Sequence, residues 1–255
     1  MGPARLRRPR RPRPARGRAH VLRPRAPLER LPGHPAHPDV SHRTLVLLRH
    51  GQTAWNAERR GQGHHDVHLD ETGVAQAAAV ASVLARLHPR LVWSSDLSRA
   101  RATASRVAEA SGVSLRTDPR LREFDLGERT GLTMPEFAQA FPEGYLAFLQ
   151  GRYDAVPGAE STEQVSARFT AALREAQATL EPGECGVVVG HGAALKVAVA
   201  ALLGWPSDAV ATFAGMDNCG WTVLDDGGPD GAARLVAWNR TITTAPDFAS
   251  AATVG

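Results

Sequence analysis

The chain has 255 residues, of which 43% are hydrophobic, and its 30 basic and 26 acidic side chains give a net charge of +4. This length allows one large domain or two small ones, and no apolar run approaches the roughly 18 residues that a membrane span requires. Two cysteines make neither a disulfide framework nor a metal-binding pattern, so we expect a reducing, cytoplasmic location.

The basic charge is concentrated at the N-terminus. Residues 1–40 hold eleven Arg, two acidic residues and nine of the 18 prolines, for a net charge of +9, whereas the remainder carries −5. Such a segment cannot bury enough apolar surface to offset its chain entropy. We therefore predict a disordered extension at 1–42, one domain at 43–245 and a flexible tail at 246–255. The basic arm contains no Lys, no aromatic residue and no periodicity, so we expect no nucleic-acid partner.

From Thr44 onward, strand patterns alternate with helix patterns. The apolar run Leu45–Leu48 predicts a buried strand, and the Ala-rich stretch at 72–87 predicts a helix. A second buried strand is predicted at 91–95. It is followed by a helix at 98–110, which Gly112 ends, and by a short strand at 113–117.

Two capping boxes mark later helices. Thr133 with Glu136 predicts a helix start, and Pro135 falls in its first turn. Ser161 with Gln164 predicts a second start, after which apolar residues recur at helical spacing as far as Leu180.

The last part of the chain predicts a strand, a helix and a hairpin. A strand buried on both faces is expected at 186–190, a helix at 193–203, and hairpin strands at 219–224 and 234–238. Repeated strand–helix units with continuous apolar strands indicate a three-layer α/β/α fold around a mostly parallel sheet. Ligands of such sheets bind beyond the carboxyl ends of the strands.

Two predicted strands end in the same way. "LVLLRHG" finishes with Arg49, His50 and Gly51, and "GVVVGHG" finishes with His191 and Gly192. One histidine at a strand tip is usually incidental, but two in the same context favour a shared site. Glycine after each histidine lets the backbone turn sharply and approach a ligand closely.

Three further side chains fit the same chemistry. Arg99 follows the strand at 91–95, Glu123 lies in an extended segment, and Asn56 follows His50 by six positions. Arginine binds phosphate through a rigid fork of donors, and a neutral histidine can attack phosphorus and carry it as phosphohistidine. A carboxylic acid can protonate the leaving alkoxide and then accept a proton from water.

These residues resemble the histidine phosphatase superfamily, in its phosphoglycerate-mutase-like branch. The resemblance runs from Thr44 to Asn239 and rests on an ordered set of motifs: "LLRHGQTAWN", "GQGHHDVHLDETGVAQA", "SSDLSRARATA", "LREFDLGERTG", "PGAES" and "VVVGHG". It implies that His50 is the phosphorylated nucleophile and Glu123 the proton donor. It further implies a phosphate pocket of Arg49, Arg99 and His191, and substrate-binding positions at Asn56, Thr53, Gln62 and Gly192.

The motifs also depart from the family's pattern. The second histidine is followed by Gly192 and not by Asp, which speaks against the acid phosphatase branch. Ala193 and Ala159 stand where the family often has Gly, and Lys196 stands where Arg is common. We expect these positions to adjust substrate contacts and to leave the chemistry unchanged.

The resemblance leaves the reaction open between hydrolysis and phosphoryl transfer. Mutases of this family have a long insertion after the proton donor, whereas here Glu160 follows Glu123 by only 37 positions, with no basic cluster between them. We therefore expect a hydrolase of small phosphomonoesters, of the sugar phosphate or phosphoglycerate type. The end of the domain, "FAGMDNCGWTVL" with "LVAWN", is similar to actinobacterial glucosyl-3-phosphoglycerate phosphatases. A cofactor-dependent phosphoglycerate mutase is the first alternative, and a non-catalytic phospho-ligand or protein-binding module is the second.

One stretch raises the question of a metal. "GHHDVH" offers His64, His65, Asp66 and His68, but this spacing matches no strong zinc pattern. We expect neither a metal nor a cofactor, and the sequence leaves a homodimer open.

Overall fold

The computed structural model describes Gly2 and residues 41–242. The chain divides into two units, Met1–Ala36 and His37–Gly255, and every described helix and strand belongs to the second unit. The expected extension at 1–42, apart from Gly2, Ser41 and His42, and the expected tail at 246–255 lie outside the described residues. The domain boundaries therefore remain predictions.

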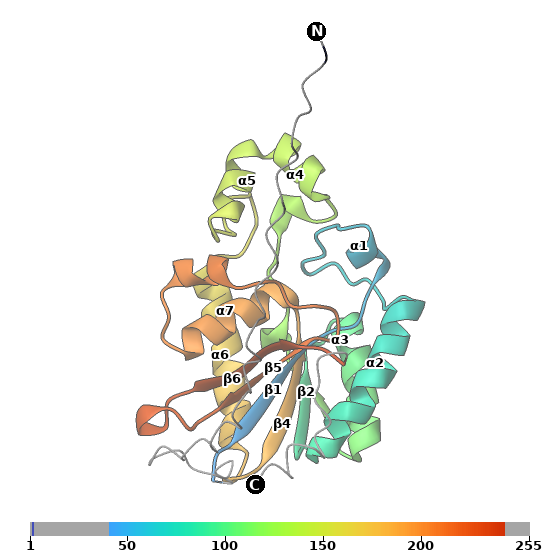
Figure 1. Cartoon of the computed structure of the whole chain (residues 1–255), viewed down its shortest axis with the longest axis vertical. Helices are drawn as coiled ribbons and strands as arrows, with labels where there is room; N and C mark the ends of the chain where they lie inside the picture. The colour runs from blue at the N-terminus through green and yellow to red at the C-terminus, as the bar shows by residue number, and fades with distance from the viewer. Residues whose placement is uncertain (1, 3–40, 243–255) are drawn as a thin grey trace. The chain divides into compact units, whose positions relative to one another are not determined.

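The described domain is built on one six-stranded sheet (Figure 1). The strand order is β3-β2-β4-β1-β5-β6. β1 to β4 are mutually parallel and β5 runs antiparallel to both of its neighbours. The strands are β1 Thr44–Arg49, β2 Leu91–Ser94, β3 Leu115–Thr117, β4 Cys185–Gly190, β5 Trp221–Asp225 and β6 Arg234–Arg240. The predicted α/β class with a mostly parallel sheet is confirmed.

Helices lie on both sides of this sheet (Figure 1). The α-helices are α1 Ala54–Ala57, α2 Glu71–Leu84, α3 Ser98–Ser111, α4 Met134–Ala140, α5 Pro142–Leu149, α6 Thr162–Ala178 and α7 Gly192–Leu202. Short 3₁₀ turns occur at Ala85–Leu87, Pro119–Leu121, Gly127–Arg129, Ser207–Thr212 and Pro229–Gly231. In the described part of the chain, no helix is long and apolar enough to cross a membrane.

The apolar run of β1 is buried on both faces of the sheet. Leu45 and Leu47 join the core cluster that contains side chains of α6 and α7. Val46 and Leu48 point the other way, into the cluster with side chains of α2 and α3. Alternation along a strand thus fills two cores, which explains why the run is continuously hydrophobic.

The register of β1 and β4 brings the two histidines together. Arg49 pairs with Gly190, and the backbone N–H of His50 donates to the Gly190 carbonyl at 3.1 Å. His191 follows Gly190 directly, so both histidines leave the carboxyl ends of adjacent parallel strands. The fold places the candidate site at this edge.

Local sequence signals decide several boundaries as predicted. Both capping boxes form, at Thr133 for α4 and at Ser161 for α6. Gly112 ends α3 in the left-handed conformation, with φ of 69°. The antiparallel pair of β5 and β6 confirms the hairpin, although β5 begins two residues later and ends one residue later than predicted, and β6 ends two residues later.

The glycine after His50 has a different role from the expected one. A Cβ on Gly51 would lie 2.6 Å from the carbonyl oxygen of Gly73, in the first turn of α2. Gly51 is therefore needed for close packing of α2 against the strand tip. At Gly192 the space is less restricted, because a Cβ there would lie 3.4 Å from Nε of Arg49, and a close approach to a ligand remains a prediction.

Candidate active site

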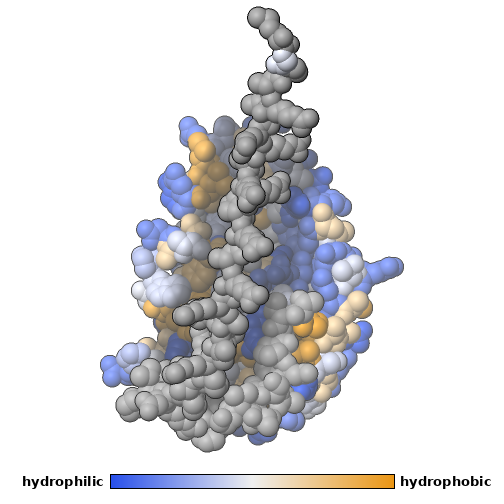
Figure 2. All heavy atoms as spheres, in the orientation of Figure 1, coloured by the Kyte–Doolittle hydropathy of each residue, from blue (hydrophilic) through white to orange (hydrophobic). Residues whose placement is uncertain are grey.

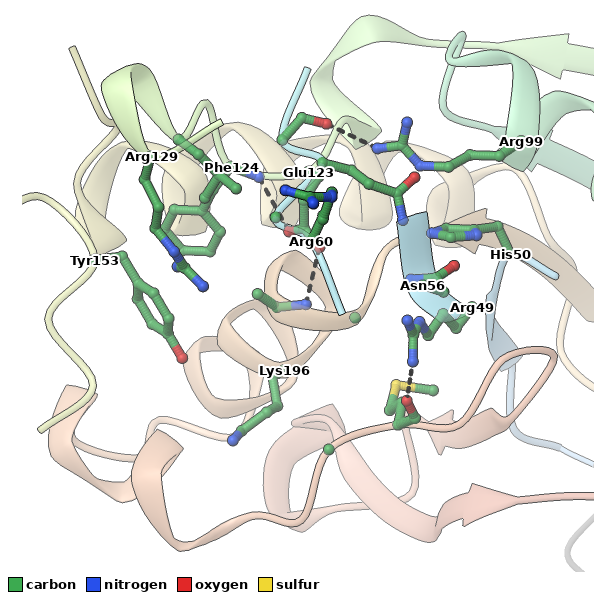
Figure 3. Close-up of a pocket in the computed structure, with 18 of the residues that line it drawn as sticks. Arg49, His50, Asn56, Arg60, Arg99, Glu123, Phe124, Arg129, Tyr153 and Lys196 are labelled. Carbon is green, nitrogen blue, oxygen red and sulfur yellow. Dashed lines mark hydrogen bonds between the residues drawn. The ribbon is translucent and has the colours of Figure 1, made fainter. Parts of the chain in front are cut away.

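A cavity of about 320 Å³ opens beyond the carboxyl ends of β1 and β4 (Figure 3). Seven of the residues predicted for the site line it: Arg49, His50, Asn56, Gln62, Arg99, Glu123 and Gly192. They come from segments spread over most of the domain, so the fold assembles the site from distant parts of the sequence. His191 and Thr53 do not line the cavity.

Within the described residues, one hydrogen bond orients the ring of His50. Its Nδ1 lies 2.7 Å from the carbonyl oxygen of Gly51, and a carbonyl can only accept, so Nδ1 bears the proton. Nε2 is left with its lone pair. Burial lowers the pKa of His50 well below its usual value, and the charges of Arg99 and Arg49 lower that pKa further. A neutral imidazole with a free Nε2 is the form that can act as a nucleophile.

Two arginines flank His50, of which Arg99 is buried and Arg49 is partly buried (Figure 3). The guanidinium of Arg99 donates to the carbonyls of His65 and Gly63 at 2.9 and 2.7 Å, and that of Arg49 donates to the Met216 carbonyl. Burial lowers the pKa of Arg99 to about 10 and also lowers that of Arg49, so both are protonated at neutral pH. Nε of each arginine is buried with no partner among the described residues. An anion in the cavity would satisfy these donors.

His191 lies next to His50 and is fully buried. The two ring centroids are 5.1 Å apart, and neither nitrogen of His191 has a hydrogen-bond partner within the described part of the chain. Burial lowers the pKa of His191 well below its usual value, followed by the effect of Arg99. Buried polar atoms are rarely unpaired, so the orphaned His191 ring indicates a ligand group that completes it.

Glu123 is held by the N-terminus of α7. Its Oε1 accepts from the backbone N–H groups of Ala194 and Phe124 at 2.8 and 3.0 Å, and its Oε2 accepts from Ala193 at 3.1 Å. These bonds fix the carboxyl group at the cavity wall, between the two arginines and the outer part of the pocket (Figure 3).

Arg168 supports the Glu123 segment and was not identified from the sequence. Its guanidinium, on α6, donates to the carbonyls of Arg122 and Glu123 at 2.7 Å each and forms an ion pair with Glu160 at 2.7 Å. Nε2 of His64 contacts the same Glu123 carbonyl at 2.8 Å. Capping and ion-pair patterns give no signal for such a role, because the partners are backbone carbonyls from a distant segment.

Asn56 and Thr53 form the capping box of the short helix α1. The Thr53 hydroxyl accepts from the Asn56 backbone N–H at 3.2 Å, and Asn56 Oδ1 accepts from the Thr53 backbone N–H at 3.1 Å. Nδ2 of Asn218 also donates to Asn56 Oδ1, at 3.2 Å. Asn56 lines the cavity, whereas the buried Thr53 side chain serves to cap the helix that carries Asn56.

The outer wall of the cavity contains residues that the motifs did not single out. Arg60, Arg129 and Tyr153 line it, together with Lys196. The sequence indicated no basic cluster between Glu123 and Glu160. The structure differs because the cations come from three separate segments and meet only in the folded chain. Ala193 also lines the cavity, whereas Ala159 does not.

The "GHHDVH" loop does not form a metal site in the described residues. Within 41–242, no group of three His, Cys, Asp or Glu side chains converges as metal binding would require. That the chemistry needs no metal remains a prediction.

Comparison with known proteins places the chain in a family. Residues 45–241 match the model of the histidine phosphatase superfamily (branch 1). The glucosyl-3-phosphoglycerate phosphatase of Mycobacterium tuberculosis is 37% identical over 218 residues, which cover 80% of this chain and 98% of the relative. The probable phosphoglycerate mutase GpmB of Cronobacter sakazakii is 40% identical over 185 residues, covering 71% of this chain and 84% of its own.

Solved structures agree with this assignment. The structure of a mycobacterial glucosyl-3-phosphoglycerate phosphatase in complex with VO3 superposes with a TM-score of 0.73 at 39% identity, and covers 78% of this chain and 100% of that chain. The family predicted from the ordered motifs is thus confirmed. The chain belongs to the histidine phosphatase superfamily, branch 1, and with it to the phosphatase enzymes.

Proposed function

We propose that this protein hydrolyses phosphomonoesters through a phosphohistidine formed on Nε2 of His50. The observation that carries the proposal is the bond from His50 Nδ1 to the Gly51 carbonyl, which leaves Nε2 unprotonated beside Arg49 and Arg99. Nucleophilic catalysis needs this combination of a free lone pair and fixed positive charge.

In the first step, Nε2 of His50 attacks phosphorus and the bond from phosphorus to the ester oxygen breaks. Arg49, Arg99 and His191 are proposed to stabilise the charge on the non-bridging oxygens, because each has a buried nitrogen without a described partner and each lies near His50. The carboxyl group of Glu123 gives its proton to the leaving oxygen, and an alcohol is released.

In the second step, water attacks the phosphohistidine. The Glu123 carboxylate accepts a proton from this water, the bond between phosphorus and Nε2 breaks, and inorganic phosphate leaves. Nε2 regains its lone pair and Glu123 its proton, so the enzyme returns to its starting form. Asn56, Gln62 and Gly192 are proposed to position the substrate, because they line the same cavity.

The proposed substrates are small phosphorylated sugar acids, with glucosyl-3-phosphoglycerate as the first candidate. The similarity to phosphatases named for that compound supports this choice. The cavity volume of about 320 Å³ is near the lower end of the range for small-molecule sites, which suits a metabolite better than a phosphoprotein.

A mutase is the second candidate, favoured by the cations of the outer wall and by the similarity to GpmB. A mutase must return the phosphoryl group to a sugar acid before water attacks. The two reactions are separated by following 2- and 3-phosphoglycerate together with free phosphate by ³¹P NMR. Release of phosphate without interconversion of the two esters supports hydrolysis.

The phosphohistidine is tested by trapping. Brief incubation with ³²P-labelled substrate, an alkaline quench and peptide mapping should place an acid-labile, alkali-stable label on His50. His50→Ala should abolish label and turnover, whereas replacement of the exposed His68 by Ala should preserve both. Label on His191 or Ser94 would contradict the assignment.

We further propose a cytoplasmic location, because both cysteines are free and burial raises the pKa of each thiol to about 12. Neither cysteine is a reactive thiolate at neutral pH and neither forms a disulfide, so neither requires an oxidising compartment. Cell fractionation tests this.

A homodimer and the absence of nucleic-acid binding remain predictions, to be checked by light scattering and a gel-shift assay.

A further inference from the structure

The cavity has two cationic regions, and the proposed chemistry uses only one of them. In Figure 3, Arg49, Arg99 and His50 lie on one side of Glu123, whereas Arg129 and Tyr153 lie on the other, and Lys196 lines the cavity from α7. Among the described lining residues, Glu123 is the single carboxylate. A phosphoryl group on His50 would leave the second region without a negative partner.

Arg129 is the centre of this second region. It ends the 3₁₀ turn Gly127–Arg129, and its Cζ lies 4.1 Å from the ring centroid of Phe148 on α5 and 4.6 Å from that of Phe137 on α4. The two rings fix the guanidinium from the side of α4 and α5. The guanidinium edge that faces the cavity is thereby preorganised.

Arg129 is incompletely satisfied in the described structure. Its Nη2 makes a weak contact with Sδ of Met134 at 3.6 Å, its Nε is buried without a partner, and it forms no ion pair within residues 41–242. An arginine present only for packing could be replaced by an apolar residue without this cost. An unpaired Nε beside a cavity is the edge that binds a carboxylate in a bidentate manner.

Two neighbours strengthen the case for an anion at this position. Lys196 lines the cavity and has three donors, one of which goes to the Phe213 carbonyl at 2.9 Å. Tyr153 lines the cavity and interacts electrostatically with both Arg129 and Glu123. Arg60 contributes less, because it already forms ion pairs with Glu58 and Glu136.

The order of groups along the cavity defines the kind of substrate that fits. His50 marks the phosphorus, Glu123 marks the bridging ester oxygen, and Arg129 interacts electrostatically with Glu123 from the far side. We propose that Arg129, assisted by Lys196, binds a carboxylate on the substrate's alcohol portion and so selects phosphorylated hydroxy acids over uncharged phosphomonoesters. This inference rests on the proposed function and specifies its substrate class.

The test compares two substrates that differ in one group: 3-phosphoglycerate, which has a carboxylate, and glycerol 3-phosphate, which has a hydroxymethyl group there. For the full chain, kcat/KM should be higher with 3-phosphoglycerate. Arg129→Met should lower it about 10- to 100-fold for 3-phosphoglycerate, the range of a charge-assisted hydrogen bond, and should change it much less for glycerol 3-phosphate. In Arg129→Met, the preference for 3-phosphoglycerate over glycerol 3-phosphate should disappear.

Arg116→Met is the matched control. Arg116 also stacks on an aromatic ring, at 3.8 Å from the centroid of Trp93, but it is not a cavity residue. Its replacement should leave the ratio of the two kcat/KM values unchanged. An equal loss on both substrates after Arg129→Met would mean that Arg129 maintains the pocket's shape, and would overturn the inference.

Binding without turnover separates this inference from the proposed function. In the His50→Ala background, calorimetry should give a lower Kd for 3-phosphoglycerate than for glycerol 3-phosphate, and Arg129→Met should remove the difference. Equal binding of both ligands before that change would refute the carboxylate site even if His50 is phosphorylated. If the His50→Ala protein binds 3-phosphoglycerate more tightly but the unaltered chain hydrolyses neither ester, the proposed function is refuted and the carboxylate site is not.

Discussion

The imidazoles of His50 and His191 are buried together among arginines, and their protonation is therefore tied to folding. Both have pKa values well below the usual one, mainly because burial disfavours the charged form. Because both histidines are neutral, they add no positive charge to the two fixed charges of Arg49 and Arg99. The phosphate dianion then meets cations that were already in place before it binds.

This arrangement predicts a loss of stability in mild acid. Below about pH 6.5 the unfolded chain protonates both histidines while the folded chain does not, so the free energy of unfolding falls as pH falls, until the lowered folded pKa values are reached. The slope is at most about 1.4 kcal/mol per pH unit for each histidine. Urea unfolding at pH 7.5 and 5.5 measures it.

Two variants test the origin of that slope. Replacing His50 and His191 together by Asn should flatten the dependence between these pH values, whereas replacing the exposed His68 by Asn should leave it unchanged. An unaltered slope in the double variant would assign the acid sensitivity to other groups.

The proposed role of Glu123 as proton donor predicts that the loss of rate on its replacement depends on the leaving group. Glu123→Gln removes the proton donor, so kcat/KM for an alkyl phosphate should fall about 10²- to 10⁴-fold. p-Nitrophenyl phosphate should be affected much less, because nitrophenolate leaves without a proton. Equal losses on both substrates would show that Glu123 holds structure or substrate and that the acid is another residue.

At the scale of elements, the site depends on two helices, α6 and α7, that pack into the same core on one side of the sheet. The N-terminus of α7 fixes the Glu123 carboxyl group, and α6 fixes the Glu123 backbone through Arg168. α6 in turn begins at the Ser161 capping box, one residue after Glu160, which pairs with Arg168. The position of the proposed acid is therefore set by two helices, of which α7 also lines the cavity.

Arg168 is accordingly predicted to be a positioning residue. Arg168→Lys keeps the charge but cannot reach the carbonyls of Arg120, Arg122 and Glu123 and a carboxylate at once, so kcat for an alkyl phosphate should fall about tenfold. The loss on p-nitrophenyl phosphate should be smaller, as for Glu123. Replacing the exposed Arg174 of the same helix by Lys should change neither rate. A uniform loss on both substrates would indicate a purely structural role.

At the scale of the whole molecule, the N-terminal extension is predicted to be dispensable. The strand β1 begins at Thr44, and the residues just before it are tied to the domain, since both His42 and Arg43 contact Asp226. A protein beginning at Val40 should match the full chain in kcat and Tm. A loss of more than about 1 kcal/mol in unfolding free energy, a sizeable share of a marginal fold, would show that the extension packs on the domain.

Much of this architecture was predictable because local rules govern it. The apolar run of β1 and the capping boxes depend on neighbouring residues alone, and both formed as expected. The meeting of His50 and His191 was also accessible, since parallel strands present their carboxyl ends at one edge.

The remaining features depend on contacts between distant segments. Arg129 takes its place from two phenylalanines on α4 and α5, and Arg168 from carbonyls more than forty positions away. Glycine is needed at position 51 because the backbone of Gly73 packs closely against it, and no rule for turns indicates this contact. A single sequence carries no signal for such pairs, because each partner looks ordinary in its own surroundings.

The strand order has a consequence for how the enzyme is made. β1 pairs with β4 and β5, and β4 separates it from β2, so the first strand to leave the ribosome finds its neighbours only after most of the domain has been translated. Until then the run Leu45–Leu48 is exposed to chaperones and to aggregation. Premature termination before β4 removes the strand that carries His191, so an incomplete translation product has no partial activity.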